Sequence, residues 1–129
     1  MLKQPEPPSY PVPTWDESGI VPETERIQIK QNWDEIRATM SHYVGIVRSN
    51  ERLRRARRRL RLIQEEIASY YWKHPVSQDL LELRNLAQVA ELIVQSAQQR
   101  HESRGLHYST DYPVTEDQGK DTILKPADL

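Results

Sequence analysis

Cysteine and phenylalanine are absent from this chain of 129 residues, and glycine occurs only four times. Without cysteine, the chain can form no disulfide, thiolate metal site, iron–sulfur cluster or cysteine nucleophile. Four scattered glycines cannot build the turn that holds dinucleotide phosphates, and the sequence contains neither a P-loop nor a GxSxG motif. No apolar run approaches the roughly 20 residues that span a bilayer. The sequence therefore contains no recognisable catalytic machinery and no membrane segment.

Charge is unevenly distributed along the chain, although the net charge is only −1. Acids outnumber bases by four in residues 1–35 and again in residues 76–129, whereas bases outnumber acids by seven in residues 36–75. The hydrophobic content of 36% is enough for only a modest core. These properties predict one small domain. We expect a cytoplasmic location, because residues 1–15 lack the hydrophobic stretch of a signal peptide.

Six of the nine prolines fall within the first 22 residues, where they remove backbone donors and disfavour helix. Residues 1–25 are therefore predicted to form an extended linker. Residues 26–113 are predicted to form the folded domain. Residues 114–129 are a polar tail whose order the sequence leaves open.

Three amphipathic helices are predicted between these ends, because apolar residues recur at spacings of three or four. The apolar positions are Ile29, Trp33, Ile36, Met40, Val44 and Val47 in the first, Leu53, Ala56, Leu60, Ile63, Ile67 and Tyr70 in the second, and ten positions from Leu80 to Ala97 in the third. The third helix is apolar over so wide an arc that we expect it to be the most buried. The predicted fold is all-α: a three-helix, up-down-up bundle similar to a spectrin repeat, with an extended N-terminal linker and a C-terminal strap.

Residues that start and stop helices support these three segments. Ser49 or Asn50 can cap the second helix, and Ser77 can cap the third. Gly45 either permits close packing of the first helix or marks its end. Gly105 is placed to provide a left-handed C-terminal cap for the third helix.

Seven arginines crowd one stretch of the second predicted helix: Arg52, Arg54, Arg55, Arg57, Arg58, Arg59 and Arg61. On a helical wheel they spread around the side away from the apolar seam. Glu51 and Glu65 each lie four residues from an arginine with which they can pair. Such a face could bind nucleic-acid phosphates or contact an acidic partner domain. We favour the partner domain, because the arginines form no groove-reading stripe and guanidinium groups suit interface ion pairs.

The four histidines offer no helical i, i+4 pair and no standard ligand triad with neighbouring acids, so no metal site is predicted. They are His42, His74, His101 and His107. His107 differs from the others because it follows a glycine turn among charged and aromatic residues: Glu102, Arg104, Tyr108 and Asp111. Such a cluster could be catalytic, but we favour docking or pinning of the loop, because the loop lies so close to a helix end.

Three stretches of the sequence are distinctive in combination: NWDEIRATMSHYVGIVRSNERL, LLELRNLAQVAELIVQSAQQR and HESRGLHYSTDYP. Together they resemble the helical C-terminal domain of L-aspartate oxidases, a branch of the succinate dehydrogenase and fumarate reductase flavoprotein family. The ESRG-x-H ending is similar to that of the dehydrogenases, whereas LHYSTDYP followed by a short tail looks more like the oxidases. Two alternatives stay open: the equivalent domain of a succinate dehydrogenase or fumarate reductase flavoprotein, and a free-standing Arg-rich bundle that binds nucleic acid or protein.

The resemblance implies a longer enzyme that binds FAD and oxidises L-aspartate to iminoaspartate, the first step of bacterial NAD biosynthesis. In that family the catalytic residues lie in the flavin-binding and capping domains, which would be the partners of this chain. No catalytic, cofactor-binding or metal-binding residue therefore transfers to this sequence. We expect the chain alone to hold no FAD and to be inactive, and we expect Met1 to mark a boundary inside a longer protein.

The residues that do transfer from the resemblance are assigned to packing within the bundle and docking against the flavin domain. They are Arg48, Arg84, Asn85, Glu102, Arg104, His107, Tyr108, Asp111 and Tyr112. Nucleic acid and membrane are not expected as partners. Self-association of the isolated chain through uncovered helix seams is left open by the sequence.

Overall fold

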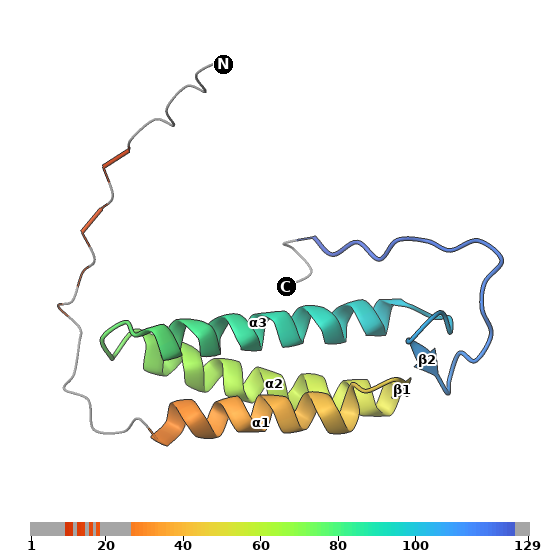
Figure 1. Cartoon of the computed structure of the whole chain (residues 1–129), viewed down its shortest axis with the longest axis horizontal. Helices are drawn as coiled ribbons and strands as arrows, with labels where there is room; N and C mark the ends of the chain where they lie inside the picture. Colours follow the sequence, from red (N-terminus) through yellow and green to blue (C-terminus); the bar gives the residue numbers. More distant parts are fainter. Residues whose placement is uncertain (1–9, 12, 15, 17, 19–26, 126–129) are drawn as a thin grey trace, which may run out of the picture.

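The computed structural model describes residues 10, 11, 13, 14, 16, 18 and 27–125. In this part of the chain, three helices form a bundle: α1 (Ile27–Tyr43), α2 (Asn50–Tyr71) and α3 (Gln78–Gln99). Successive helices run in opposite directions (Figure 1), which confirms the predicted all-α, up-down-up fold. The linker predicted for residues 1–25 falls largely outside the described residues.

Capping serines fix the starts of α2 and α3, as the sequence predicted. The Oγ of Ser49 accepts a hydrogen bond from the backbone N–H of Arg52 at 3.2 Å. The Oγ of Ser77 accepts one from the backbone N–H of Leu80 at 3.3 Å. Each bond satisfies an amide that the first helical turn leaves free, and such a cap contributes about 1 kcal/mol.

The core consists of one apolar stripe from each helix. The stripe on α2 is made of Leu53, Ala56, Leu60, Ile63, Ile67 and Tyr71. The prediction placed Tyr70 at its end, but a spacing of four residues after Ile67 keeps Tyr71 on the buried face. Tyr70 is instead half-buried and stacks on His74, with 3.6 Å between ring centroids.

α1 ends earlier than its apolar pattern suggested. The helix stops at Tyr43, and the backbone N–H of Val44 donates the last helix-like hydrogen bond, to the carbonyl of Met40 at 3.0 Å. Gly45 follows directly and is exposed. The sequence allowed two roles for this glycine, close packing or the end of the helix, and the structure shows the end of the helix. Val47, predicted as a helical core position, is 49% exposed and lies in a strand.

Among the described residues, α3 buries seven, α2 six and α1 three. This order agrees with the prediction that the third helix is the most buried. Its apolar arc is nevertheless wider than the bundle covers. Val89 and Ile93 are 51% and 42% exposed. Two neighbouring helices can cover only part of a third, so the outer part of the arc remains on the surface.

Two short strands lie at the end of the bundle where α1 stops and α2 starts (Figure 1). β1 (Val47–Arg48) pairs in parallel with β2 (Tyr108–Ser109), with Val47 opposite Tyr108 and Arg48 opposite Ser109. No sequence pattern predicted this ladder, because two residues are too few to display an alternating period. β2 itself lies in the segment that was expected to be an extended strap.

The tail after Pro113 is tied to the end of α3 as far as residue 122. The backbone N–H of Ser103 donates to the carbonyl of Val114 at 3.0 Å, and Arg100 Nη2 donates to the carbonyl of Lys120 at 3.0 Å. The trace then runs back beside α3 (Figure 1). With a third bond, from Arg100 Nη2 to Thr122 Oγ1 at 2.9 Å, these bonds connect residues 114–122 to the bundle.

The arginine-rich side of α2 faces solvent, as predicted: only Arg57 among the seven is half-buried. Glu51 forms ion pairs with Arg54 at 2.8 Å and Arg55 at 2.9 Å. Within the described residues, the pair expected between Arg61 and Glu65 is not formed. Exposed pairs on one helix contribute only about 0.3–0.5 kcal/mol each.

None of the helices in the described part of the chain combines the length and the apolar character needed to cross a lipid bilayer.

Candidate functional site

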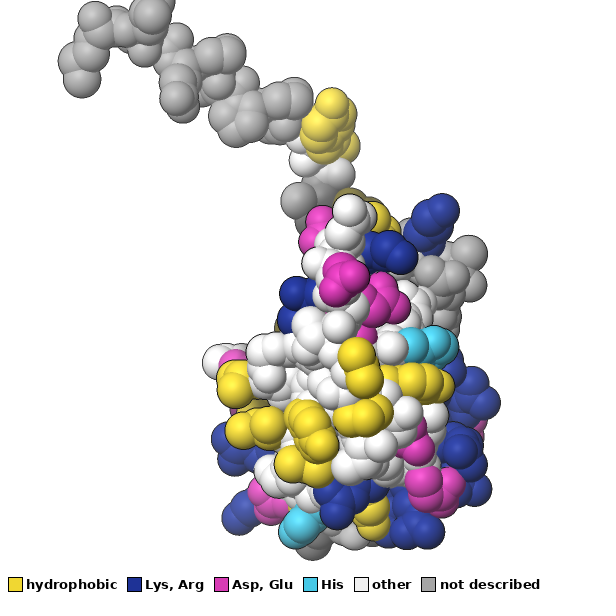
Figure 2. All heavy atoms as spheres, turned by 90° about the vertical axis from the view of Figure 1, so that its right-hand side faces the viewer, with side chains coloured by type: hydrophobic (Ala, Val, Ile, Leu, Met, Phe, Trp, Pro, Cys, Tyr) yellow, Lys and Arg dark blue, Asp and Glu magenta, His cyan; other side chains and the backbone are white. Residues whose placement is uncertain are grey.

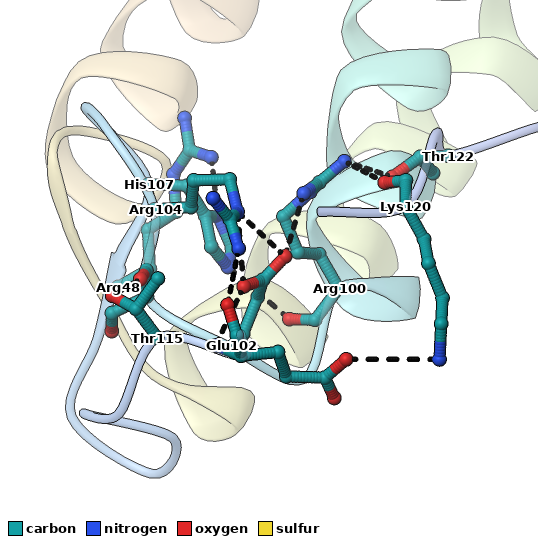
Figure 3. Close-up of polar contacts among 10 residues, drawn as sticks. Arg48, Arg100, Glu102, Arg104, His107, Thr115, Lys120 and Thr122 are labelled. Atoms are coloured by element: carbon teal, nitrogen blue, oxygen red, sulfur yellow. Dashed lines mark hydrogen bonds and ion pairs between the residues drawn. The ribbon is translucent and has the colours of Figure 1, made fainter. Parts of the chain in front are cut away.

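The candidate site is the loop that follows α3, residues 100–112, together with its contacts on β1 and at the start of α2. Figure 3 shows the polar contacts around Glu102 and His107. α3 ends at Gln99 because Arg100 adopts an extended conformation, with φ −88° and ψ 100°. The prediction that Gly105 caps α3 is therefore wrong. Gly105 instead lies in a tight turn in which Arg104 and His107 exchange backbone hydrogen bonds of 2.9 and 3.1 Å.

Glu102 is the centre of the polar network in this loop, and it is only 5% exposed. Its carboxylate accepts hydrogen bonds from Arg100 at 2.9 Å, from Arg104 Nε at 3.1 Å to each oxygen, and from the backbone N–H of Glu116 at 3.0 Å. The hydrogen bond from Arg104 is the main cause that lowers the pKa of Glu102. Burial opposes this effect and raises the pKa. The Glu116 N–H and the charges of Arg104 and Arg100 lower the pKa further. Glu102 is therefore ionised at neutral pH and joins three segments of chain.

His107 is buried with a partner on each ring nitrogen. Nδ1 lies 2.9 Å from Arg48 Nη1, and Nε2 lies 3.2 Å from the carbonyl oxygen of Arg100. Because a guanidinium only donates and a carbonyl only accepts, these partners assign the tautomer that carries its proton on Nε2. Burial, followed by the positive charge of Arg48, lowers the pKa of His107. The imidazole is therefore neutral at pH 7.

Arg48 connects this imidazole to the end of α1. Its Nε donates to the carbonyl of Gly45 at 2.8 Å, and its Nη2 donates to the carbonyl of Val44 at 3.3 Å. Carbonyls just past the end of a helix lack intrahelical partners, and a cation there interacts favourably with the helix dipole. One side chain thus closes α1 and anchors the loop after α3.

Asp111 and Tyr112 attach the same loop to the start of α2. Asp111 Oδ2 accepts a hydrogen bond from the backbone N–H of Asn50 at 2.6 Å, and the Tyr112 hydroxyl accepts one from Asn50 Nδ2 at 3.3 Å. A carboxylate at a helix N-terminus is favoured by the helix dipole. The Tyr112 ring also stacks on His101, with 4.6 Å between centroids.

The structure does not bring all the predicted docking residues together. Arg84 and Asn85 lie in the first half of α3, away from the loop, where Arg84 donates to the Tyr71 hydroxyl at 3.0 Å and lies 4.9 Å from the centroid of that ring. Tyr108 lies in β2 and is 43% exposed. The other six predicted residues form the connected network described above.

Arg100 and Thr115 belong to this network but were missed from the sequence. Arg100 Nη2 reaches Thr122 Oγ1 at 2.9 Å in addition to the Lys120 carbonyl, and Thr115 Oγ1 donates to the carbonyl of Ser103. One signal could have revealed Arg100: it alternates with Glu102 and Arg104, and alternate residues of an extended segment lie on the same side. Nothing in the sequence marks Thr115.

Gly105→Ala is expected to lower the free energy of unfolding by about 1–2 kcal/mol, because the φ of +58° lies in the left-handed region that an L-residue avoids. An added Cβ would meet no heavy atom within 4 Å, so the loss reflects the backbone alone. Gly105→Asn should lose less, since asparagine tolerates this conformation. Urea unfolding of both variants measures the difference. Equal losses would contradict a purely backbone origin.

The geometry supports pinning of the loop, not catalysis. The Glu102 carboxylate already accepts hydrogen bonds from Arg100, Arg104 and the backbone of Glu116, and both nitrogens of His107 have partners. A general acid or base instead needs a group that can exchange a proton with substrate. Among the residues that the structure describes, no group of three or more His, Asp and Glu side chains could hold a metal ion.

The sequence of this chain is similar to a known protein family over most of the bundle and the loop after α3. Residues 33–125 match the family model described as fumarate reductase flavoprotein C-term. The chain is 55% identical over 91% of its length to L-aspartate oxidase 1 of Ralstonia nicotianae, and 55% identical over 89% to L-aspartate oxidase of Pseudomonas aeruginosa. It is 44% identical over 72% to the chloroplastic L-aspartate oxidase 2-b of Nicotiana tabacum.

The chain spans 22%, 21% and 15% of the lengths of these three relatives. The family match includes α1 from Trp33 onward, both strands, α2, α3 and the complete polar network. The chain therefore belongs to the fumarate reductase flavoprotein C-terminal domain family, and its relatives there are L-aspartate oxidases.

Proposed function

We propose that this chain is the non-catalytic C-terminal helical domain of an FAD-dependent L-aspartate oxidase. The complete enzyme would convert L-aspartate to iminoaspartate for NAD biosynthesis in the cytoplasm, and this domain would pack against its flavin-binding and capping domains. The observation that carries the proposal is the 55% identity to two bacterial L-aspartate oxidases over 91% and 89% of the chain. The family model alone does not single out the oxidases, because its description names fumarate reductase.

The N-termini of α2 and α3 do not fit the pyrophosphate of FAD. A dinucleotide pyrophosphate binds free backbone amides at a glycine-rich helix N-terminus. At α2, Ser49 and Asp111 already accept from such amides, and Ser77 does so at α3. No step of flavin chemistry is therefore assigned to this chain, and in this proposal the flavin is held by the remaining part of the enzyme.

A supporting role for the domain agrees with where its polar side chains are directed. Arg48, Glu102, Arg104 and His107 hold one another and the backbone, so they shape the loop. In the proposed enzyme this rigid loop would meet the flavin domain, and Arg84 with Asn85 would contact it or the capping domain from α3.

The arginine-rich side of α2 favours an acidic protein surface over nucleic acid as its partner. Arg54 and Arg55 share Glu51, and Arg57 pairs with Glu91 at 3.1 Å. These pairs reduce the positive field that clustered arginines would present to phosphates. Binding of DNA or RNA at two salt concentrations tests the alternative, which predicts tight binding with a steep salt dependence.

The complete protein is expected to be yellow and to oxidise L-aspartate, whereas the 129-residue chain should be colourless and inactive. Absorbance spectra of both purified proteins measure bound flavin, and hydrogen peroxide release with aspartate or succinate measures activity. A complete protein that oxidises succinate but not aspartate would favour the dehydrogenase alternative. Flavin in the short chain would contradict the assignment of a non-catalytic domain.

A further inference from the structure

The β1–β2 ladder has one inward face and one outward face. Arg48 and Ser109, which are register partners, lie on the inward side: Ser109 is 4% exposed, and Arg48 reaches His107. Val47 and Tyr108, the other register partners, are 49% and 43% exposed. Parallel strands are almost always covered on both faces, so a parallel pair with an open apolar face is unusual.

Three further apolar residues of the segments that adjoin the strands are exposed: Ile46, Leu106 and Val114, at 57%, 75% and 75%. The carbonyl of Ile46 accepts the backbone N–H of Tyr108 at 3.2 Å, which keeps the two segments together. We call Ile46, Val47, Leu106, Tyr108 and Val114 the ladder patch. Figure 2 shows hydrophobic side chains gathered on this end of the bundle. Contiguous exposed apolar surface of this kind marks interaction sites.

The ladder patch is held rigidly although it consists of loop and strand segments. The backbone N–H of Thr110 donates to the carbonyl of Arg48 at 2.9 Å, and the Ser103 Oγ accepts from the backbone N–H of Ser109 at 2.9 Å. Ser103 also holds the carbonyl of Val114 through its own N–H. A surface that is already ordered loses little conformational entropy when a partner binds.

The ladder patch contains no ionisable side chain except the Tyr108 phenol. At its margin, Arg52 Nη1 donates to the carbonyl of Val47 at 3.2 Å. Two other arginines of the site are engaged inside the loop, because Arg48 is bound to His107 and Arg104 is bound to Glu102. The five patch side chains are therefore expected to meet apolar side chains of the partner, with Arg52 at the edge of that contact.

We propose that the ladder patch is the surface on which the flavin-binding domain of the oxidase docks, an inference that rests on the proposed function. The relatives are about four times as long as this chain, so most of their polypeptide lies outside the domain. All five patch residues fall within the stretch that matches the family model. The flavin-binding domain is the occupant because a neighbour in the same polypeptide is permanently available to cover an apolar surface.

Single-cysteine variants test this docking surface, because the chain has no cysteine of its own. Val47→Cys and Leu106→Cys report on the patch, and Val76→Cys, in the turn between α2 and α3 and 37% exposed, is the control. Each variant is made in the 129-residue chain and in the complete oxidase, and maleimide modification of that position is followed by peptide mass spectrometry. Docking should slow the reaction of the two patch cysteines at least about tenfold in the oxidase, while Val76→Cys reacts equally in both proteins.

Backbone hydrogen exchange of the unmodified proteins provides a second measurement that no substitution can disturb. Slower exchange of residues 46–48 and 106–110 in the oxidase supports docking. Unchanged modification and exchange in a flavin-containing, aspartate-oxidising protein would overturn the docking surface and leave the proposed function intact. A dimer of the short chain in which Val47→Cys and Leu106→Cys are already protected would instead identify a second copy as the occupant. Failure of the proposed function is read separately, as the lack of flavin and of aspartate oxidation.

Discussion

Leu60→Ala is expected to lower the free energy of unfolding by about 2–5 kcal/mol, the usual cost of removing a large side chain from a packed core. Leu60 is 0% exposed and lies in the middle of the α2 stripe. Truncation there removes apolar burial and leaves a cavity that three rigid helices can close only in part. Urea unfolding followed by circular dichroism measures the loss.

Leu62→Ala is the matched control, because it makes the same chemical change on the same helix at a position that is 61% exposed. We expect it to change stability by no more than about 0.5 kcal/mol. Comparable losses at both positions would show that the burial of α2 differs from the arrangement described here.

Acidification from pH 7.5 to pH 5 is expected to destabilise the domain through His107. Its folded pKa is lowered by burial and by Arg48, so below the ordinary value of 6.5 the unfolded chain binds a proton that the folded domain resists. The contribution of neutral His107 to the free energy of unfolding is complete above pH 6.5 and declines as the pH falls. The slope is at most about 1.4 kcal/mol per pH unit. Urea unfolding at several pH values between 7.5 and 5 measures this slope.

His107→Gln should flatten that slope, because glutamine can donate and accept hydrogen bonds at this position without titrating. His42→Gln, at an exposed position of α1, should leave the slope unchanged. Glu102 does not confuse the measurement, since its lowered pKa affects stability only below the ordinary carboxyl value of 4.5. A slope that persists in His107→Gln would assign the pH dependence to other groups.

Much of the bundle could be predicted from sequence because helices carry their signal locally. The spacing of Leu53, Ala56, Leu60, Ile63 and Ile67 identified the buried stripe of α2. Residue type and position predicted Ser77 as the cap of α3 and left Ser49 or Asn50 for α2, where the structure shows Ser49. The end of α1 was misjudged because Val44 and Val47 continue the apolar spacing, while the polypeptide actually leaves the helix before Gly45.

The candidate site was predictable only in part, because its contacts join residues far apart in the chain. The sequence indicated that Glu102, Arg104 and His107 form a special loop, but not that Arg48 would reach His107 across 59 positions. The left-handed backbone conformation of Gly105 was predicted correctly. Its role in a turn was not, because that role depends on the helix ending before Arg100. The parallel ladder depends on how α1 and α3 end side by side, and no local pattern encodes that.

The ladder also bears on the order in which the domain assembles. Val47 and its register partner Tyr108 are 61 residues apart, and the whole α2–α3 hairpin lies between them. Contacts of that separation require closure of a long loop, whereas the hairpin forms between neighbouring segments. We expect the helices to assemble first, and the ladder to form last and open first. A partner bound over the ladder would therefore lengthen the lifetime of the folded domain by opposing the earliest step of its unfolding.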